Sequence, residues 1–341
     1  MKNNYVGIMV ANPKLRKHVL RKYLQHNTTN LKLFCFTPSS INWKKKSVIG
    51  LYRSNRRWVL SKLSFPQVIY NRCYHTDQAL IQRLETEIGS NKCFNHINQL
   101  NKHEIYSRLS KWLVDYLPDT VLYNQENAVQ FLEVYKVIYF KPCCGHKGKG
   151  VYRVELMESG EIHIGLHYFA PDVIVGDVEQ YHKNIQELIG STPYIIQKGV
   201  ELGQLNKQNF DIRALVQKNE SGLWSVTNLV SRIAYTGSYN TSICEKTCLS
   251  LEVLHQLYPP EKVYAIIGTI YNISLRTAEI IETETSYHLG EFSVDFALDN
   301  DEQVWIIELN GKPQKDLYEG LDKQDEVYMR PIQYARFLYT I

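Results

Sequence analysis

The residues from 291 to 313 read EFSVDFALDNDEQVWIIELNGKP. Two runs of alternating residues flank the polar cluster at 299–302, and this pattern predicts a β-hairpin with Leu298 opposite Gln303. Successive side chains of a strand point to opposite faces, so one face of the hairpin is apolar apart from that glutamine. We expect this face to be buried, with Val294, Phe296, Leu298, Trp305, Ile307 and Leu309 on it and Ala297, Val304 and Ile306 on the other.

The opposite face of the predicted hairpin also carries three oxygen-bearing side chains. Asp295 lies on the first strand, and Glu308 and Asn310 lie two residues apart on the second. Carboxylate and amide oxygens are the ligands that Mg²⁺ prefers, alongside substrate phosphates and water. The alternative is an ordinary polar strand face exposed to solvent, so the hairpin alone leaves the metal site open.

The composition is typical of a soluble globular protein. The chain has 341 residues, of which 44% are hydrophobic and 22% are charged. No apolar run is long enough for a membrane span, and the N-terminal apolar stretch is too short for a signal peptide. The seven cysteines form no CxxC pair, so we expect free thiols in a reducing cytoplasm.

Charge is distributed unevenly along the chain. Up to Gly150 there are 24 Lys and Arg against 8 Asp and Glu, whereas the remainder has 15 against 27. A basic half favours an anionic ligand or surface, and Trp43–Lys46 and Arg53–Trp58 mix basic and aromatic residues. Because no nucleic-acid motif accompanies them, we favour solvated strand edges and expect no nucleic-acid partner.

A glycine-rich loop follows the predicted strand Val137–Lys141. Glycines allow the backbone to approach a ligand closely, and successive backbone N–H groups can then hold phosphate oxygens. The GxxxxGK[ST] pattern is absent and a strand, not a helix, follows, which excludes a P-loop and a Rossmann turn. A flexible hairpin remains the alternative, although the loop mixes Gly145, Gly148 and Gly150 with His146, Lys147 and Lys149 and follows Lys141.

Further elements surround this loop. A β–α–β opening and a helix at Asp77–Ile88 indicate a small N-terminal domain that ends near Asn98. The predicted helix Asn101–Leu113, with Asn101 as its cap, places Lys102 in its first turn. Lys102 is either a solvated surface lysine or could reach a phosphate at the mouth of an adjoining cleft. Arg213 and Arg232 fall on two strands of one sheet; they suit bidentate phosphate or carboxylate contacts, or structural pairing with nearby acids.

The ordered set of motifs resembles the ATP-grasp superfamily, and within it the endospore coat-associated YheC/YheD family. The resemblance extends from about Asn101 to the C-terminus, through FKP with a GxxGxG loop, QKGV, DIR, a later arginine, VDFALD and WIIELNGKP. It implies an α/β (α+β) ATP-grasp fold after a small α/β domain at 1–98. The grasp domain would cover 99–341, with a nucleotide-clamping lobe at about 120–200 and a metal and substrate lobe at about 201–341.

The resemblance also implies roles for individual residues. Lys102, Lys141 and the loop would contact the phosphates of ATP, and Asp211 would meet the ribose or order this region. Gln197, Lys198 and Val200 would form the hinge that meets adenine. Arg213, Arg232 and Asn240 would act on the transferring phosphate or a substrate carboxylate, and Asp295, Glu308 and Asn310 would hold one or two Mg²⁺, with Mn²⁺ as the alternative ion.

The implied chemistry is ATP-dependent ligation of a carboxylate to an amine through an acyl phosphate, on a peptide-like or amino-acid-like substrate. The segment GSYNTSICEKTCLS at 237–250 lacks the glycine pair of related ligases, which leaves a second hypothesis of an ATP-binding structural or regulatory protein without turnover. The resemblance further implies spore association, spore coat proteins as partners, and a cytoplasmic or coat-associated location.

Overall fold

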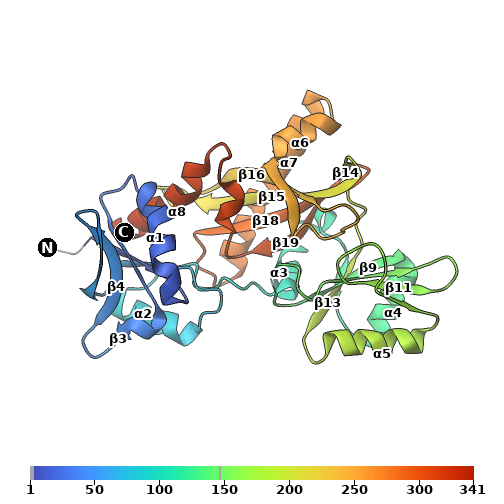
Figure 1. The fold of residues 1–341 in the computed structure, drawn as a ribbon, viewed down its shortest axis with the longest axis horizontal. Helices are drawn as coiled ribbons and strands as arrows, with labels where there is room; N and C mark the ends of the chain where they lie inside the picture. Colours follow the sequence, from blue (N-terminus) through green and yellow to red (C-terminus); the bar gives the residue numbers. More distant parts are fainter. Residues whose placement is uncertain (1–3, 146) are drawn as a thin grey trace.

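The computed structural model describes residues 4–145 and 147–341, and three β-sheets organise these residues. The N-terminal sheet lies at one end of the molecule in Figure 1, the C-terminal sheet lies at the centre, and the middle sheet lies at the other end. Order in space therefore differs from order along the chain. None of the described helices is long and apolar enough to cross a membrane.

The N-terminal sheet begins with the predicted β–α–β unit, since β1 pairs in parallel with β2 and the helix α1 connects them. Its strand order is β3-β4-β2-β1-β6-β7, and β5 pairs with β4. The elements are β1 (Tyr5–Met9), α1 (Arg16–Gln25), β2 (Lys32–Phe36), β3 (Ile41–Asn42), β4 (Ser47–Ser54), β5 (Arg57–Ser64), β6 (Val68–Asn71), α2 (Gln78–Ile88) and β7 (Cys93–Phe94).

The middle sheet is antiparallel throughout, in the order β12-β11-β10-β9-β13-β8. The helices α4 and α5 share one hydrophobic core with this sheet. The elements, with the helix α3 that precedes them, are α3 (Lys102–Leu109), β8 (Thr120–Leu122), α4 (Gln125–Tyr135), β9 (Val137–Pro142), β10 (Tyr152–Leu156), β11 (Ile162–Gly165), β12 (Val173–Val175), α5 (Val178–Ile189) and β13 (Tyr194–Lys198).

The C-terminal sheet has the order β17-β16-β15-β18-β19, with β14 against β15. Both its faces are covered: Ala214 of β15 belongs to the core beneath α7, whereas Leu215 belongs to the core that α8 shares with the N-terminal sheet. The elements are β14 (Gln204–Leu205), β15 (Gln208–Lys218), β16 (Trp224–Ala234), β17 (Cys244–Leu249), α6 (Ser250–Leu257), α7 (Pro260–Glu284), β18 (Glu291–Leu298), β19 (Val304–Asn310) and α8 (Gln324–Thr340).

The predicted hairpin is confirmed as β18 and β19, but its register differs from the prediction. Leu298 pairs with Val304 instead of Gln303, and an irregularity between Asp295 and Phe296 leaves Ile307 as an extra residue on β19. Val304 and Ile306 are therefore buried, and the prediction that Trp305 and Ile307 occupy the buried face is wrong. The same irregularity places Asp295 directly opposite Glu308.

Candidate functional site

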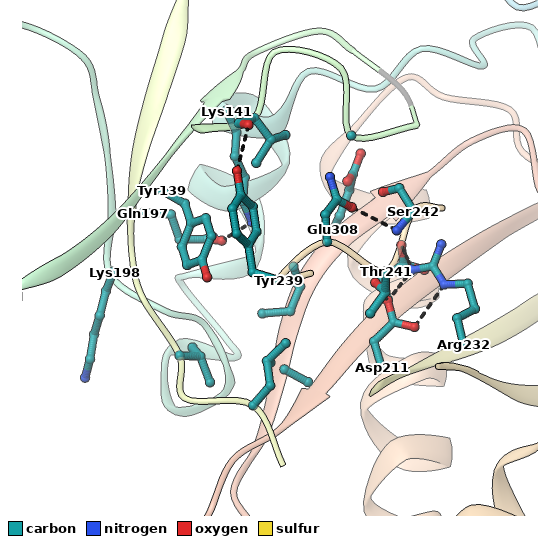
Figure 2. Close-up of a pocket in the computed structure, with 18 residues that line it drawn as sticks. Tyr139, Lys141, Gln197, Lys198, Asp211, Arg232, Tyr239, Thr241, Ser242 and Glu308 are labelled. Atoms are coloured by element: carbon teal, nitrogen blue, oxygen red, sulfur yellow. Dashed lines mark hydrogen bonds and ion pairs between the residues drawn. The ribbon is translucent and has the colours of Figure 1, made fainter. Parts of the chain in front are cut away.

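A pocket of about 750 Å³ lies between the middle sheet and the C-terminal sheet. Figure 2 shows Tyr139, Lys141 and Gln197 on one side of it and Asp211 and Arg232 on the other. The sequence-predicted residues that line this first pocket are Lys141, Gly148, Gln197, Lys198, Val200, Asp211, Arg232, Asn240, Asp295 and Glu308.

Lys141 is a buried cation on β9 that faces the first pocket. Its Nζ donates to Gln197 Oε1 at 2.5 Å, and Gln197 Nε2 donates to Thr120 Oγ1 at 3.0 Å. Burial lowers the pKa of Lys141 to about 8, against the opposing effect of the Glu308 carboxylate. Burial disfavours the protonated form of Lys141, and the negative charge of a phosphate in the pocket would stabilise that form. Lys141 is therefore suited to bind an anionic ligand.

Asp295 lies at the centre of a buried cluster of charges. Arg213 donates to its two oxygens at 2.7 Å each, and Arg232 Nη2 donates to Oδ2 at 2.9 Å. Burial alone would raise the pKa of Asp295, but the two guanidinium groups outweigh it and hold the pKa at about 2. Asp211 accepts from Arg232 Nε at 2.9 Å and from Thr241 Oγ1 at 2.6 Å. Both predicted arginines therefore already have acidic partners, which is the structural pairing that the sequence left open.

The three predicted metal ligands do come together on the hairpin. Asn310 Nδ2 donates to Asp295 Oδ2 at 3.3 Å, and Glu308 Oε1 lies 3.1 Å from Lys102 Nζ. Two carboxylates and an amide on one strand pair fit Mg²⁺ by ligand type. Within residues 4–145 and 147–341, however, no group of three or more His, Cys, Asp or Glu is arranged to hold a metal, so Asn310 and substrate oxygens would have to complete the site.

The glycine-rich loop connects the antiparallel strands β9 and β10. Lys147, Gly148 and Gly150 have positive φ, and a Cβ on Gly148 would lie 2.2 Å from Asn240 Nδ2. This close approach brings the loop against the segment that carries Asn240. The prediction for His146 lies outside the described residues. Lys149 is exposed, and the lining of the first pocket includes neither Gly145 nor Lys149 nor Gly150.

Two contacts fix the loop from outside the middle sheet. Lys102 begins α3 as predicted, with Asn101 as its cap, and its backbone N–H donates to Cys143 O at 2.8 Å. From the N-terminal sheet side, Tyr74 Oη donates to Gly145 O at 2.9 Å. The loop that would close over a ligand is therefore tied to both neighbouring parts of the fold.

A second pocket, of about 1150 Å³, adjoins the first and shares Arg232, Ser242, Asp295 and Glu308 with it. Of the predicted residues it adds Lys147, Arg213 and Asn310. Sequence reasoning missed three cations that line it, namely Arg72, Lys312 and Lys315. The two lysines follow the hairpin within GKPQK and could have been noticed there, but nothing near Arg72 in the sequence links it to this site.

Sequence reasoning also missed part of the first pocket. Tyr139 and Tyr239 line it with ring centroids 5.5 Å apart, and Thr241 and Ser242 follow in the same segment. Tyr239 Oη donates to Gly165 O at 3.0 Å, so this segment docks onto the middle sheet. In the segment 237–250 the sequence pointed to Asn240 and to a missing glycine pair but not to these neighbours, because the docking depends on contacts between distant strands.

A family model described as YheC/D-like ATP-grasp matches residues 90–338. The chain belongs to this ATP-grasp family. Among curated relatives of the YheC/D family, the endospore coat-associated protein YheD of Bacillus subtilis strain 168 is 24% identical over 324 residues, which is 89% of this chain and 70% of YheD. YheC of the same organism is 21% identical over 327 residues, which is 89% of this chain and 87% of YheC.

Solved ATP-grasp structures share the fold at low sequence identity. The D-alanine–D-alanine ligase of Coxiella burnetii has a TM-score of 0.56 at 10% identity, over 97% of this chain and 96% of that chain. The ATP-grasp ligase PsnB, solved with a minimal precursor, Mg and ADP, has a TM-score of 0.53 at 12% identity, over 99% of both chains. The mixed α/β ATP-grasp fold is thus shown, and ATP-grasp membership generally implies ATP binding with Mg²⁺. The roles of individual residues stay predictions.

Proposed function

We propose that the protein is an ATP- and Mg²⁺-dependent ligase that joins a carboxylate to an amine through an acyl phosphate. One observation carries this proposal: two pockets adjoin at Arg232, Asp295 and Glu308. A nucleotide in the first pocket and an acceptor in the second would meet at these charged residues. Such an arrangement suits transfer of a phosphoryl group between two bound substrates.

The first pocket supports nucleotide binding residue by residue. Lys102, Lys141 and the loop at 145–150 would contact phosphate oxygens, with backbone N–H groups and charge together. Gln197, Lys198 and Val200 would meet adenine, and Tyr139 and Tyr239 offer aromatic surface to a base. Asp211 would order the ribose side through Arg232 and Thr241, its partners in the cluster.

The proposed reaction has two chemical steps. A carboxylate oxygen of one substrate attacks the γ-phosphorus of ATP, and ADP leaves. An amine nitrogen of the other substrate then attacks the acyl carbon, the C–O bond to phosphate breaks, and phosphate leaves with loss of a proton from nitrogen. Arg213, Arg232 and Asn240 would bind the equatorial oxygens or the substrate carboxylate. Mg²⁺ held by Asp295, Glu308 and Asn310 would neutralise phosphate charge, with one or two ions and Mn²⁺ as the alternative.

Peptide-like substrates are the class that we propose. The ATP-grasp ligase PsnB has been solved with the precursor peptide PsnA2, and D-alanine–D-alanine ligase joins amino acids by its name, although both likenesses show the fold alone. The names of YheD and YheC support spore association, with spore coat proteins as partners and a cytoplasmic or coat-associated location. The alternative is an ATP-binding coat or regulatory protein without turnover. In that case the first pocket binds ATP, but no acceptor reacts.

The test begins with calorimetric titration of the full chain with Mg²⁺ and a non-hydrolysable ATP analogue. We expect micromolar binding, a loss of at least tenfold in affinity for Glu308→Ala, and no change for Glu133→Ala, an exposed glutamate of α4. Absence of binding to the wild type would contradict the proposal. ADP release is then screened against carboxylate and amine pairs, and binding without any acceptor-dependent release would favour the alternative.

A further inference from the structure

The cations that line the second pocket differ in how far their charge is neutralised. Arg213 and Arg232 share Asp295, and Arg232 also pairs with Asp211, so these two positive charges face two negative ones. Lys102 and Glu308 likewise pair at the junction with the first pocket. Apart from Lys147 of the glycine-rich loop, which also lines this pocket, any surplus positive charge must therefore come from its other end.

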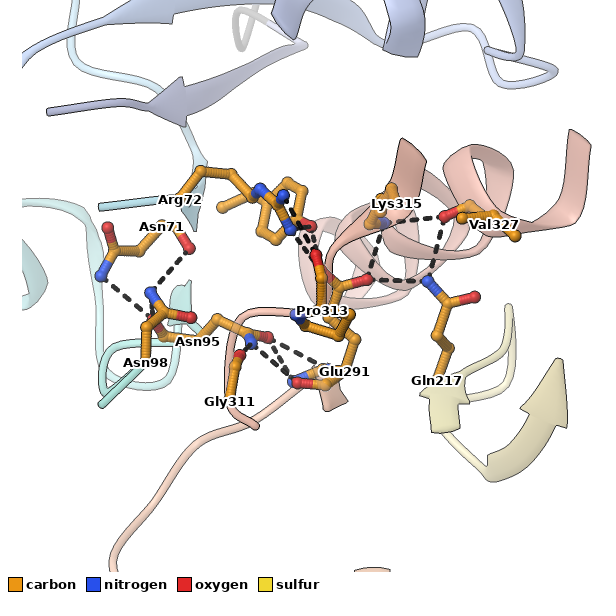
Figure 3. A network of polar contacts seen from close by, with 12 residues as sticks. Asn71, Arg72, Asn95, Asn98, Gln217, Glu291, Gly311, Pro313, Lys315 and Val327 are labelled. Atoms are coloured by element: carbon orange, nitrogen blue, oxygen red, sulfur yellow. Dashed lines mark hydrogen bonds and ion pairs between the residues drawn. The ribbon is translucent and has the colours of Figure 1, made fainter. Parts of the chain in front are cut away.

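At that other end one carboxylate forms ion pairs with two cations, as Figure 3 shows. Glu291 is fully buried; its Oε1 lies 2.8 Å from Arg72 Nη1 and its Oε2 lies 2.7 Å from Lys315 Nζ. Lys315 also donates to Val327 O at 2.7 Å. Both cations line the second pocket, so this group presents one net positive charge to the cavity.

Lys312 adds a further positive charge on a rigid support. Gly311 precedes it, and a Cβ there would lie 3.0 Å from Asn98 O, while Gly311 O accepts from Asn95 Nδ2 at 2.9 Å. Within the described part of the chain, Lys312 has no hydrogen bond or ion pair, although it lines the cavity beside Arg72. Asp316, the remaining acid in the lining, accepts a hydrogen bond from Gln314 at 3.2 Å.

At this end three cations, Arg72, Lys312 and Lys315, face two acids, Glu291 and Asp316. An excess of positive charge in a cavity raises the electrostatic cost of the empty pocket and favours an anionic ligand. Arg72 and Lys312 do not line the first pocket, which places them at the end of the second pocket away from the nucleotide site. We infer that this end binds an oxyanion of the acceptor substrate, a carboxylate or phosphate distinct from the group that reacts. The inference rests on the proposed function, and it selects acceptors that carry such a second anionic group.

The experiment uses the full chain saturated with Mg²⁺ and the non-hydrolysable ATP analogue, which fills the first pocket. Glutarate and inorganic phosphate are the two probes, titrated by calorimetry at one fixed ionic strength because salt screens such contacts. The variants are Lys312→Gln, Lys312→Arg and, as a charge-matched control, Lys183→Gln on the exposed face of α5. Thermal unfolding of each variant identifies any that fails to fold.

We expect one probe to bind, Lys312→Gln to weaken it at least tenfold, and both Lys312→Arg and Lys183→Gln to stay within about threefold of the wild type. The tighter probe tells a carboxylate-bearing acceptor from a phosphate-bearing one. Equal affinity in wild type and Lys312→Gln, or no binding of either probe, would overturn the inference. The titration with the ATP analogue reports independently whether the nucleotide site binds. Repeating the probe titration without nucleotide then shows whether a missing probe signal belongs to the second pocket or to an empty nucleotide site.

Discussion

At the scale of single residues, burial determines how the candidate site responds to pH. Lys141 is a cation that the fold has removed from water, and its pKa is lowered to about 8 by that burial. Asp295 experiences the same loss of hydration but stays ionised because two arginines surround it. The charged groups next to each buried side chain therefore decide whether burial changes its protonation state near neutral pH.

The lowered pKa of Lys141 predicts a pH-dependent affinity for nucleotide. Lys141 loses its proton as the pH rises through about 8, so binding of the Mg²⁺–ATP analogue should weaken by roughly tenfold between pH 7 and pH 9.5. Lys141→Arg, which stays charged, should remove most of this dependence, and Lys141→Met should bind weakly at every pH. Calorimetric dissociation constants at four pH values decide the matter, and identical pH profiles for wild type and Lys141→Arg would refute it.

His288 predicts a pH effect on stability away from the site. Burial lowers its pKa to about 4, and Lys218 and His96 add to the shift. The folded protein therefore favours the neutral ring, so this contribution to stability is complete above pH 6.5 and is lost as the pH falls toward 4.

The measurement is the free energy of unfolding in denaturant between pH 7 and pH 4. His288→Gln should lose less stability over this range than the wild type, by on the order of 3 kcal/mol. His255→Gln, which changes an exposed histidine of α6, controls for removal of a ring from the surface. Parallel curves for wild type and His288→Gln would show that the buried ring does not carry this effect.

At the scale of elements, two glycines near each other in sequence predict opposite effects of one methyl group. A Cβ on Gly290, just before β18, would lie 2.6 Å from carbon atoms of Phe94 and Tyr334, so Gly290→Ala should destabilise the protein by about 1–3 kcal/mol. Gly268 is exposed in α7, and a Cβ there would have no atom within 4 Å, so Gly268→Ala should stabilise by about 1 kcal/mol. Denaturant titrations measure both, and a shift of the same sign in the two variants would contradict this assignment.

The elements around the site could largely be predicted from the sequence, because local signals set them. Alternating residues and a polar turn gave β18 and β19, and an asparagine cap gave the start of α3. The irregularity at Ile307 could not be predicted, since either register gives a plausible apolar face near the turn. The irregularity accompanies the pairing of Asp295 with Glu308, and no local pattern in the sequence marks it.

At the scale of the whole molecule, one buried carboxylate connects the parts of the chain. Glu291 of β18 forms ion pairs with Arg72, which follows β6, and with Lys315, which precedes α8. Gln217 of β15 also donates a hydrogen bond to Glu291 at 2.7 Å. Arg72, Lys315 and Gln217 are far apart in sequence, which is why their convergence could not be predicted.

Glu291→Ala should lower the free energy of unfolding by about 3–5 kcal/mol, because it leaves two buried cations without their counter-ion. Glu220→Ala is the matched control: Glu220 is exposed and lies 3.4 Å from Arg330, so its loss should cost no more than about 1 kcal/mol. Denaturant unfolding of both variants at pH 7 gives the comparison. Equal losses would mean that burial does not distinguish the two ion pairs.

The division of the chain at residue 98 into an N-terminal domain and a grasp domain stays a prediction. Composition and the β–α–β opening suggested it, and the N-terminal sheet is indeed separate from the other two sheets. Its core is nevertheless shared, because Val6 and Ile8 belong to the same cluster as Ile332 and Ala335 of α8. Nothing in the sequence of α8 indicates which sheet this helix covers.

This shared core has a consequence for how the protein is made. The strands β1 and β6 emerge early from the ribosome, but α8 follows roughly 250 residues later, which corresponds to about 12–50 seconds of translation. Throughout that interval the apolar face that α8 will cover lacks this helix, and only part of its core, such as Leu20 and Tyr23 of α1, is already present. The N-terminal sheet is therefore completed only after α8 has been synthesised, and until then its uncovered apolar residues are open to aggregation.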